Sequence, residues 1–317
     1  MSVKVFAPIS IGNVNVGFDI LGLAVAPLDG SLIGDLVEVS KADSVQQENN
    51  LLVRGTHCDR LPSDKKQNIV WQCIFAFNRA LKKVHKRCVF INMILEKNIP
   101  NSSGLGSSAC SVVAAIYALN EFYLRPFNEK QLLALMVDLE AEISGSRHYD
   151  NVAPCYLGGL QLIIETKDKV SQALPIFDDC FWVLAYPDVI VSTKTAREIL
   201  PKTLDIKTAV AYGQKIAGFI DASYRQDKQQ AFELLEDVIA EPYRKHLLPN
   251  FEMAKKILMS YGCLAVGISG SGPTLFAVTD DMVIAEKAQL WLEEYYIQTD
   301  QGFAKICKID LTGTRVV

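Results

Sequence analysis

The residues best suited to chemistry form a short stretch rich in glycine and serine, PNSSGLGSSAC at positions 100–110. β-Forming residues precede it at 89–95 and residues at helical spacing follow it, so we expect a strand, a loop and a helix over 109–122. Gly104 and Gly106 allow tight backbone conformations, and Ser107 or Ser108 is expected to cap the helix. The first turn would present free N–H groups that suit a phosphate. The chain has no Gly-Lys pair and therefore no Walker A motif, and a glycine-rich helix start without a ligand is an equally good interpretation.

Two acidic residues fall where their carboxylates need partners. Asp19 lies between apolar neighbours in a turn rich in glycine and asparagine, so it needs a cation or a bond to the local backbone. A helix is expected from Glu129 to about Ile143, and Glu140 follows Leu132 and Met136 on its apolar stripe. Glu140 is therefore expected to pair with a cation or to hold a metal.

Further hydrogen-bonding groups gather downstream. His148, Asp150 and Asn151 fall within four positions of an expected loop, where functional residues are common. Arg197 and Arg244 could each grip a carboxylate or phosphate through paired N–H bonds, or could form surface ion pairs. The Glu-Pro sequence before Arg244 predicts a local break that exposes this arginine.

Composition limits the class of protein. The chain has 317 residues, enough for two lobes, and a net charge of −4, which argues against a nucleic-acid partner. Its 8 cysteines include no C-x-x-C pair, so a reducing compartment is expected rather than a zinc site or disulfide framework. Residues 1–25 lack the apolar core of a signal peptide, and the longest apolar run, 109–119, is too short to span a bilayer. We therefore expect a cytoplasmic protein without a membrane partner.

The remaining pattern predicts alternating strands and helices. Asn68 is expected to cap a helix, and Ser192 or Thr193 another. Residues 265–278 suggest a strand, a glycine turn and a second strand, and Pro8 is expected to end the first strand of the chain. Further strands are expected at 36–40, 160–164, 181–186 and 303–309, and helices in most of 207–260 and at 284–296.

Several motifs together resemble the GHMP kinase superfamily over nearly the whole chain. Its phosphate motif, P-x-x-x-G-L-G-S-S, matches residues 100–108, and its N-terminal motif, N-x-x-x-G-F-D, matches residues 13–19. Its glycine-rich C-terminal motif matches residues 267–274. The homoserine kinase branch adds H-x-D-N-V-A-P at 148–154, S-T-x-x-A-R at 192–197 and E-P-x-R at 241–244.

This resemblance implies an α+β, two-lobed GHMP kinase fold, with a ribosomal-protein-S5-like lobe at 1–158 that binds ATP and a ferredoxin-like lobe at 159–317. It implies that ATP with Mg²⁺ phosphorylates the hydroxyl of L-homoserine in threonine biosynthesis, and that the chain forms a homodimer. The residues implied to wrap the ATP phosphates are Pro100, Asn101, Ser102, Ser103, Gly104, Leu105, Gly106, Ser107, Ser108, Ala109 and Cys110. Ser108 and Glu140 are implied to hold Mg²⁺. The implied substrate residues are Asn13, Asp19, His148, Asp150, Thr193, Arg197 and Arg244.

The resemblance also bears on the mechanism. Several GHMP kinases place an aspartate base near the substrate hydroxyl, whereas this chain has Asn151 at the matching position, which cannot accept a proton. We therefore expect direct attack of the hydroxyl on the γ-phosphate, with Asn13 and Asp150 orienting the hydroxyl and Asn151 stabilising the transferred group. Asn68 and Lys97 are the candidate adenine contacts.

The sequence departs from the family pattern at three positions. Ile11 and Gly12 replace the usual Ser-Ala, and Asn15 stands where many members have glycine. Asparagine tolerates left-handed backbone, so we expect the turn to survive.

Three other functions compete with this one. One is a GHMP kinase for an alcohol without an amino acid moiety, such as mevalonate. Another is a non-catalytic sensor, which would be expected to lose Glu140 or the phosphate loop. A serine hydrolase, suggested by Ser269 and Ser271 among glycines, lacks the G-x-S-x-G elbow.

Overall fold

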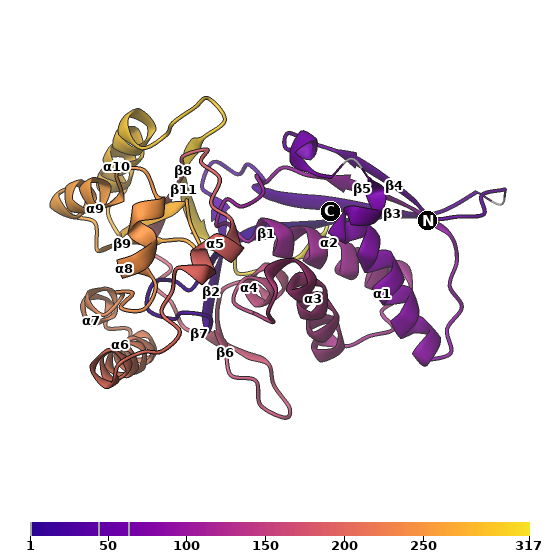
Figure 1. The fold of residues 1–317 in the computed structure, drawn as a ribbon, viewed down its shortest axis with the longest axis horizontal. Helices are drawn as coiled ribbons and strands as arrows, with labels where there is room; N and C mark the ends of the chain where they lie inside the picture. Colours follow the sequence, from indigo (N-terminus) through magenta and orange to yellow (C-terminus); the bar gives the residue numbers. More distant parts are fainter. Residues whose placement is uncertain (1, 44, 63) are drawn as a thin grey trace.

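The computed structural model describes residues 2–43, 45–62 and 64–317, which fold into an α+β molecule built on one long branched sheet (Figure 1). Its strands are β1 Ser2–Gly12, β2 Leu21–Pro27, β3 Gly34–Lys41, β4 Asn50–Arg54, β5 Ile91–Glu96, β6 Leu160–Ile163, β7 Ser171–Leu174, β8 Phe181–Tyr186, β9 Ala265–Ile268, β10 Leu275–Thr279, β11 Phe303–Ile309 and β12 Arg315–Val316. They lie in the order β4-β5-β3-β1-β2-β11-β8-β10-β9, with β6 beside β2 and β7, and with β12 beside β1.

Helices cover this sheet in two groups. The first group is α1 Ile69–Lys83, α2 Ser107–Phe122, α3 Glu129–Ser144 and α4 Val152–Leu157. The second is α5 Thr193–Glu198, α6 Ile206–Arg225, α7 Lys228–Glu233, α8 Glu241–Arg244, α9 Phe251–Ser260 and α10 Met282–Tyr295. Three short 3₁₀ segments are η1 Cys58–Arg60, η2 Lys65–Gln67 and η3 Lys245–Leu247. Figure 1 shows the first group over the N-terminal strands and the second around the C-terminal strands.

The longest strand joins the two halves of the sheet. Residues 2–8 of β1 pair with β3, whereas residues 9–12 pair with β2. We expected Pro8 to end this strand, and that expectation is wrong, because the strand continues to Gly12. Pro8 lies where β1 exchanges one partner for the other, so its missing N–H interrupts little of the ladder.

The buried side chains follow the same division. One apolar cluster lies between the N-terminal strands and α1–α3, and another lies between β9, β10, α9 and α10. A third joins Ile9 and Ile11 of β1 to Trp182 and Phe276 of the C-terminal strands, so the two halves share apolar contacts. The expected boundary at 158–159 falls in the turn between α4 and β6, while β12 returns to β1; the division into two lobes stays a prediction.

Most expected elements are found, and one helix start differs. Asn68 and Ser192 cap α1 and α5 through their side chains, as expected. The cap of α2 is Gly106, in a left-handed conformation with φ 65°, so the expectation of a serine cap is wrong. The serine hydroxyls are used elsewhere, because Ser107 Oγ donates to Ile99 O at 3.2 Å. The first-turn N–H groups of α2 therefore have no side-chain cap.

Candidate active site

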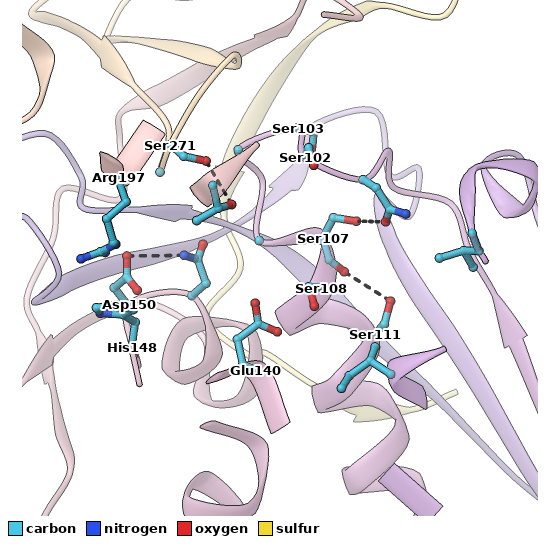
Figure 2. Close-up of a pocket in the computed structure, with 18 of the residues that line it drawn as sticks. Ser102, Ser103, Ser107, Ser108, Ser111, Glu140, His148, Asp150, Arg197 and Ser271 are labelled. Carbon is cyan, nitrogen blue, oxygen red and sulfur yellow. Dashed lines mark hydrogen bonds between the residues drawn. The ribbon is translucent and has the colours of Figure 1, made fainter. Parts of the chain in front are cut away.

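One cavity of about 400 Å³ collects residues from segments that are far apart in the chain. Figure 2 shows the serines of the 100–110 loop on one side and Arg197, Asp150 and His148 on the other, with Glu140 between them. The expected site residues among its lining are Asn13, Asp19, Asn101, Ser102, Ser103, Gly104, Gly106, Ser107, Ser108, Glu140, His148, Asp150, Asn151, Thr193, Arg197 and Arg244.

The other expected residues lie behind the cavity wall. Leu105, Ala109 and Cys110 are buried in the core, and Pro100 is buried in the loop. Cys110 Sγ donates to Ala7 O at 3.0 Å. Only the backbone of these residues could serve a ligand.

The loop at 100–106 is held from behind by the glycine turn of the C-terminal half. Thr274 Oγ1 donates to Ser103 O at 2.7 Å, and Ser269 Oγ donates to Gly104 O at 2.7 Å. Both bonds are accepted by backbone carbonyls of the loop, and neither uses an atom of α2. The glycine turn, predicted from its composition to make a close approach, thus contacts the loop directly.

The first turn of α2 faces a buried carboxylate. Glu140 Oε2 is buried on α3, and Ser108 of α2 lies close to it (Figure 2). Burial raises the pKa of Glu140 to about 7, and the Ser108 hydroxyl offsets part of that rise. Nearby positive charge would restore the ionised form, so this end of the cavity suits a cation that accompanies an anion.

At the opposite end, Asp19 and Arg197 form a two-pronged ion pair. Arg197 Nη2 lies 2.7 Å from Asp19 Oδ1 and Nη1 lies 3.1 Å from Oδ2. His148 Nδ1 is 3.5 Å from the same carboxylate. Asp19 has a φ of 62°, and Asn13 Oδ1 accepts its N–H at 2.9 Å, so the local turn bond belongs to Asn13. Both oxygens of the Asp19 carboxylate pair with the Arg197 guanidinium.

Arg244 differs from its expectation. The Glu-Pro break was expected to expose it, but only 3% of Arg244 is exposed. The proline falls in the first turn of α8, where a proline continues a helix, so it makes no break before Arg244. Its guanidinium donates to Ala196 O at 3.0 Å and to Gly270 O at 2.9 Å, and it lies 5.4 Å from the ring centre of Phe18.

Asp150 lies on the same side of the cavity as Arg197 (Figure 2). Only 5% of its surface is exposed, and burial, with a smaller contribution from the negative charge of Asp19, raises its pKa to about 7. Asn151 follows at the start of α4, and its Nδ2 is 3.4 Å from Asp150 Oδ2. The cavity therefore has a largely neutral serine and glycine end and a highly charged end.

Sequence reasoning missed several lining residues. An apolar wall is formed by Leu61, Pro62, Ile69 and Leu95, and it lies beside Asn68. No periodic signal marks Leu61 and Pro62, which lie at the end of a 3₁₀ segment. The candidate adenine contact Lys97 does not line the cavity and lies behind its serine wall, with its Nζ 2.5 Å from Asp35 Oδ2 and 2.9 Å from both Ser107 O and Ser111 Oγ.

Two family models match this chain. The model of the GHMP kinases N terminal domain matches residues 68–159, and that of the GHMP kinases C terminal matches residues 219–298. The chain belongs to the GHMP kinase family. It is thus a kinase of this family with an α+β fold, as the motifs predicted.

Solved structures extend the likeness over the full chain. A homoserine kinase from Cytophaga hutchinsonii is 33% identical, with a TM-score of 0.88, over 100% of this chain and 97% of that one. A candidate homoserine kinase from Listeria monocytogenes is 22% identical, with a TM-score of 0.69, over 99% of each chain. An L. major mevalonate kinase in complex with R-mevalonate is 14% identical, with a TM-score of 0.68, over 98% of this chain and 96% of that one. The last two show only the fold.

Among the residues that the structure describes, no helix is both long and apolar enough to cross a membrane.

Proposed function

We propose that this kinase transfers the γ-phosphoryl group of ATP to the hydroxyl of L-homoserine and yields O-phospho-L-homoserine for threonine biosynthesis. The observation that carries the proposal is the ion pair of Asp19 and Arg197 at the charged end of the cavity. An amino acid presents an ammonium and a carboxylate at fixed separation. A preformed pair of opposite charges, each side chain about one third exposed or less, offers a partner to both groups.

The neighbours of this pair support an acceptor with both charges. Arg244 and Arg197 both lie near the ring of Phe18, at ring-centre distances of 5.4 Å and 5.6 Å, so two positive groups are available for a carboxylate at this end. Asp150 and His148 lie on the Asp19 side, where an ammonium would be favoured. Mevalonate has no ammonium group to place beside Asp19 and Asp150.

At the neutral end, the uncapped first turn of α2 suits the phosphates of ATP. The apolar wall of Leu61, Pro62 and Ile69 suits the adenine base. The residues that would hold Mg²⁺ are Glu140 and Ser108, since a carboxylate and a hydroxyl are the hard oxygen ligands that this ion prefers. Bound with ATP, Mg²⁺ neutralises charge on the phosphates.

The reaction then needs alignment more than a strong base. The homoserine oxygen forms a bond to the γ-phosphorus while the bond to the β–γ bridging oxygen breaks, ADP leaves, and the hydroxyl proton passes to the transferred phosphoryl group or to water. Asp150 and Asn13 would orient the hydroxyl, Thr193 and the arginines would hold the carboxylate, and Asn151 Nδ2–H would donate to the phosphoryl oxygens. Asn151 lacks the basicity to take the proton.

A coupled ADP-release assay across acceptors tests the proposal, with ³¹P NMR to identify the product. We expect turnover with L-homoserine, at least about 100-fold lower kcat/KM with 4-hydroxybutyrate, and no turnover with mevalonate. Both of the other acceptors lack the ammonium group that would lie beside Asp19 and Asp150. A higher kcat/KM for mevalonate or 4-hydroxybutyrate than for L-homoserine would overturn it.

We further propose that the enzyme works as a cytoplasmic homodimer. Every cysteine of the chain is a free thiol, which suits a reducing compartment. Light scattering after size exclusion should give twice the mass of the 35.1 kDa chain, and a single-chain mass would contradict the dimer.

A further inference from the structure

One buried hydroxyl contacts the amide at the centre of the proposed reaction. Ser10 lies on β1 and is 0% exposed. Its Oγ donates to Asn151 Oδ1 at 2.9 Å. It has no place among the motif residues discussed above, and it does not line the cavity.

The surrounding groups fix the direction of this hydrogen bond. Cys155 Sγ lies 3.4 Å from Ser10 Oγ, and burial raises the pKa of that thiol to about 12, so the thiol keeps its proton and donates it. The single hydroxyl proton of Ser10 is then available for Asn151 Oδ1. On the other side, the Asp150 carboxylate faces Asn151 Nδ2 at 3.4 Å. Both neighbours favour the same orientation of the amide.

Two glycines make room for the pair. A Cβ on Gly106 would lie 2.3 Å from Ser10 Oγ and 2.9 Å from Asn151 Oδ1. A Cβ on Gly12 would lie 2.7 Å from Asn151 Nδ2. The amide is therefore packed between the phosphate loop and β1, with Oδ1 toward Ser10 and Gly106 and Nδ2 toward Gly12 and Asp150.

We propose that Ser10 is a positioning residue, which holds Oδ1 of Asn151 and so keeps the Nδ2–H face available to the transferred phosphoryl group. This inference rests on the proposed function. Without the Ser10 hydroxyl, the amide can turn over and present an oxygen, which repels phosphoryl oxygens. Substrate binding would change little, because Ser10 reaches neither ATP nor the acceptor.

The test compares Ser10→Ala with wild type at saturating Mg-ATP and L-homoserine. We expect kcat to fall on the order of 10- to 100-fold, with both KM values within about threefold. The matched control is Ser223→Ala, which removes another 0% exposed serine hydroxyl, bonded to Phe219 O at 2.9 Å in α6. The control should keep wild-type kcat.

A double-mutant cycle separates positioning from general structure. If Ser10 acts through Asn151, Ser10→Ala should cost nothing further in kcat when Asn151→Ala is already present. An equal loss in both backgrounds would show a structural role and overturn the inference, as would a wild-type kcat for Ser10→Ala.

A crystal structure of the Ser10→Ala variant gives a readout that does not depend on the acceptor. We expect the Asn151 side chain to leave its position or to show two orientations. If wild type fails to phosphorylate L-homoserine, the proposed function fails, and this structure alone decides the positioning role. An Asn151 side chain that keeps its orientation, with Nδ2 still toward Asp150, would then overturn it.

Discussion

The two ends of the cavity are built in different ways. The phosphate end is a continuous stretch, 100–108, whose contribution is backbone N–H groups and small side chains. The acceptor end takes Asp19, Asp150, Arg197 and Arg244 from four separate segments, and its contribution is charge. The phosphate end depends on the local backbone conformation and on close contacts with its neighbours. The acceptor end depends on charged partners that the fold brings together. Substitutions at the two ends should therefore impair the enzyme in different ways.

The largest effect should follow from adding one methyl group at the phosphate end. Gly106 has a φ of 65°, and a Cβ there would lie 2.3 Å from Ser10 Oγ. We expect Gly106→Ala to lower kcat by about 1,000-fold, because both the loop and Asn151 must shift. Steady-state kinetics measure this. The control is Gly30→Ala, where φ is 77° but nothing lies within 4 Å. Equal activity losses in the two variants would show that backbone strain alone matters.

The second-largest effect on activity should follow from removing the charge of Glu140. Glu140→Gln keeps the shape but removes the charge proposed to hold Mg²⁺, so we expect kcat to fall by about 100-fold and the Mg²⁺ concentration for half-maximal activity to rise. Glu142→Gln, on an exposed position of the same helix, should leave both unchanged. A Mg²⁺ titration identical to that of wild type would remove Glu140 from the metal site.

At the acceptor end, an arginine substitution should affect binding more than chemistry. Arg197→Lys loses the two-pronged geometry, so we expect KM for L-homoserine to rise about 10- to 100-fold with kcat within threefold. Arg225→Lys is the control, since Arg225 forms an exposed pair with Asp221 at 2.8 Å. If kcat falls while KM stays constant, Arg197 acts on the transition state and the contrast between the two ends disappears.

The same difference explains what the sequence could predict. The phosphate loop was recognisable because its residues are neighbours in the chain and its conformation is local. The left-handed turn also survived its Asn15 substitution, with φ 56°, as expected from asparagine. The inward fold of Arg244 was missed, because only the packing of α8 against the glycine turn determines it. Ser10 was missed because a single serine in an apolar strand gives no signal until its partner Asn151, at the N-cap of α4, is known.

Protonation of Asp150 should make acceptor use depend on pH. Burial raises its pKa to about 7, helped by the charge of Asp19 and opposed by Arg197 and Arg244, so the carboxyl becomes neutral as pH falls below that value. A neutral carboxyl binds the substrate ammonium less well. At saturating Mg-ATP, bound metal would hold Glu140 ionised, so kcat/KM for L-homoserine should fall about tenfold per pH unit between pH 7 and 5.5. For Asp150→Asn, kcat/KM for L-homoserine should be lower than wild type at every pH and constant between pH 7 and 5.5. If kcat/KM of this variant still falls as the pH is lowered, the titrating group is His148 or Glu140.

The smallest effect should come from Gly12, where the two ends meet. Family members usually have alanine here, yet in this chain a Cβ would lie 2.7 Å from Asn151 Nδ2 and 2.8 Å from Asp150 Oδ2. Both contacts are with side-chain ends that can move by a few tenths of an ångström, so we expect Gly12→Ala to lower kcat/KM about three- to tenfold without loss of folding. Gly213→Ala, with nothing within 4 Å, is the control. A loss confined to kcat would place the strain on Asn151 and the phosphate end, and one confined to KM for L-homoserine would place it on Asp150. Wild-type kinetics would mean that the missing methyl group does not set the geometry of this site.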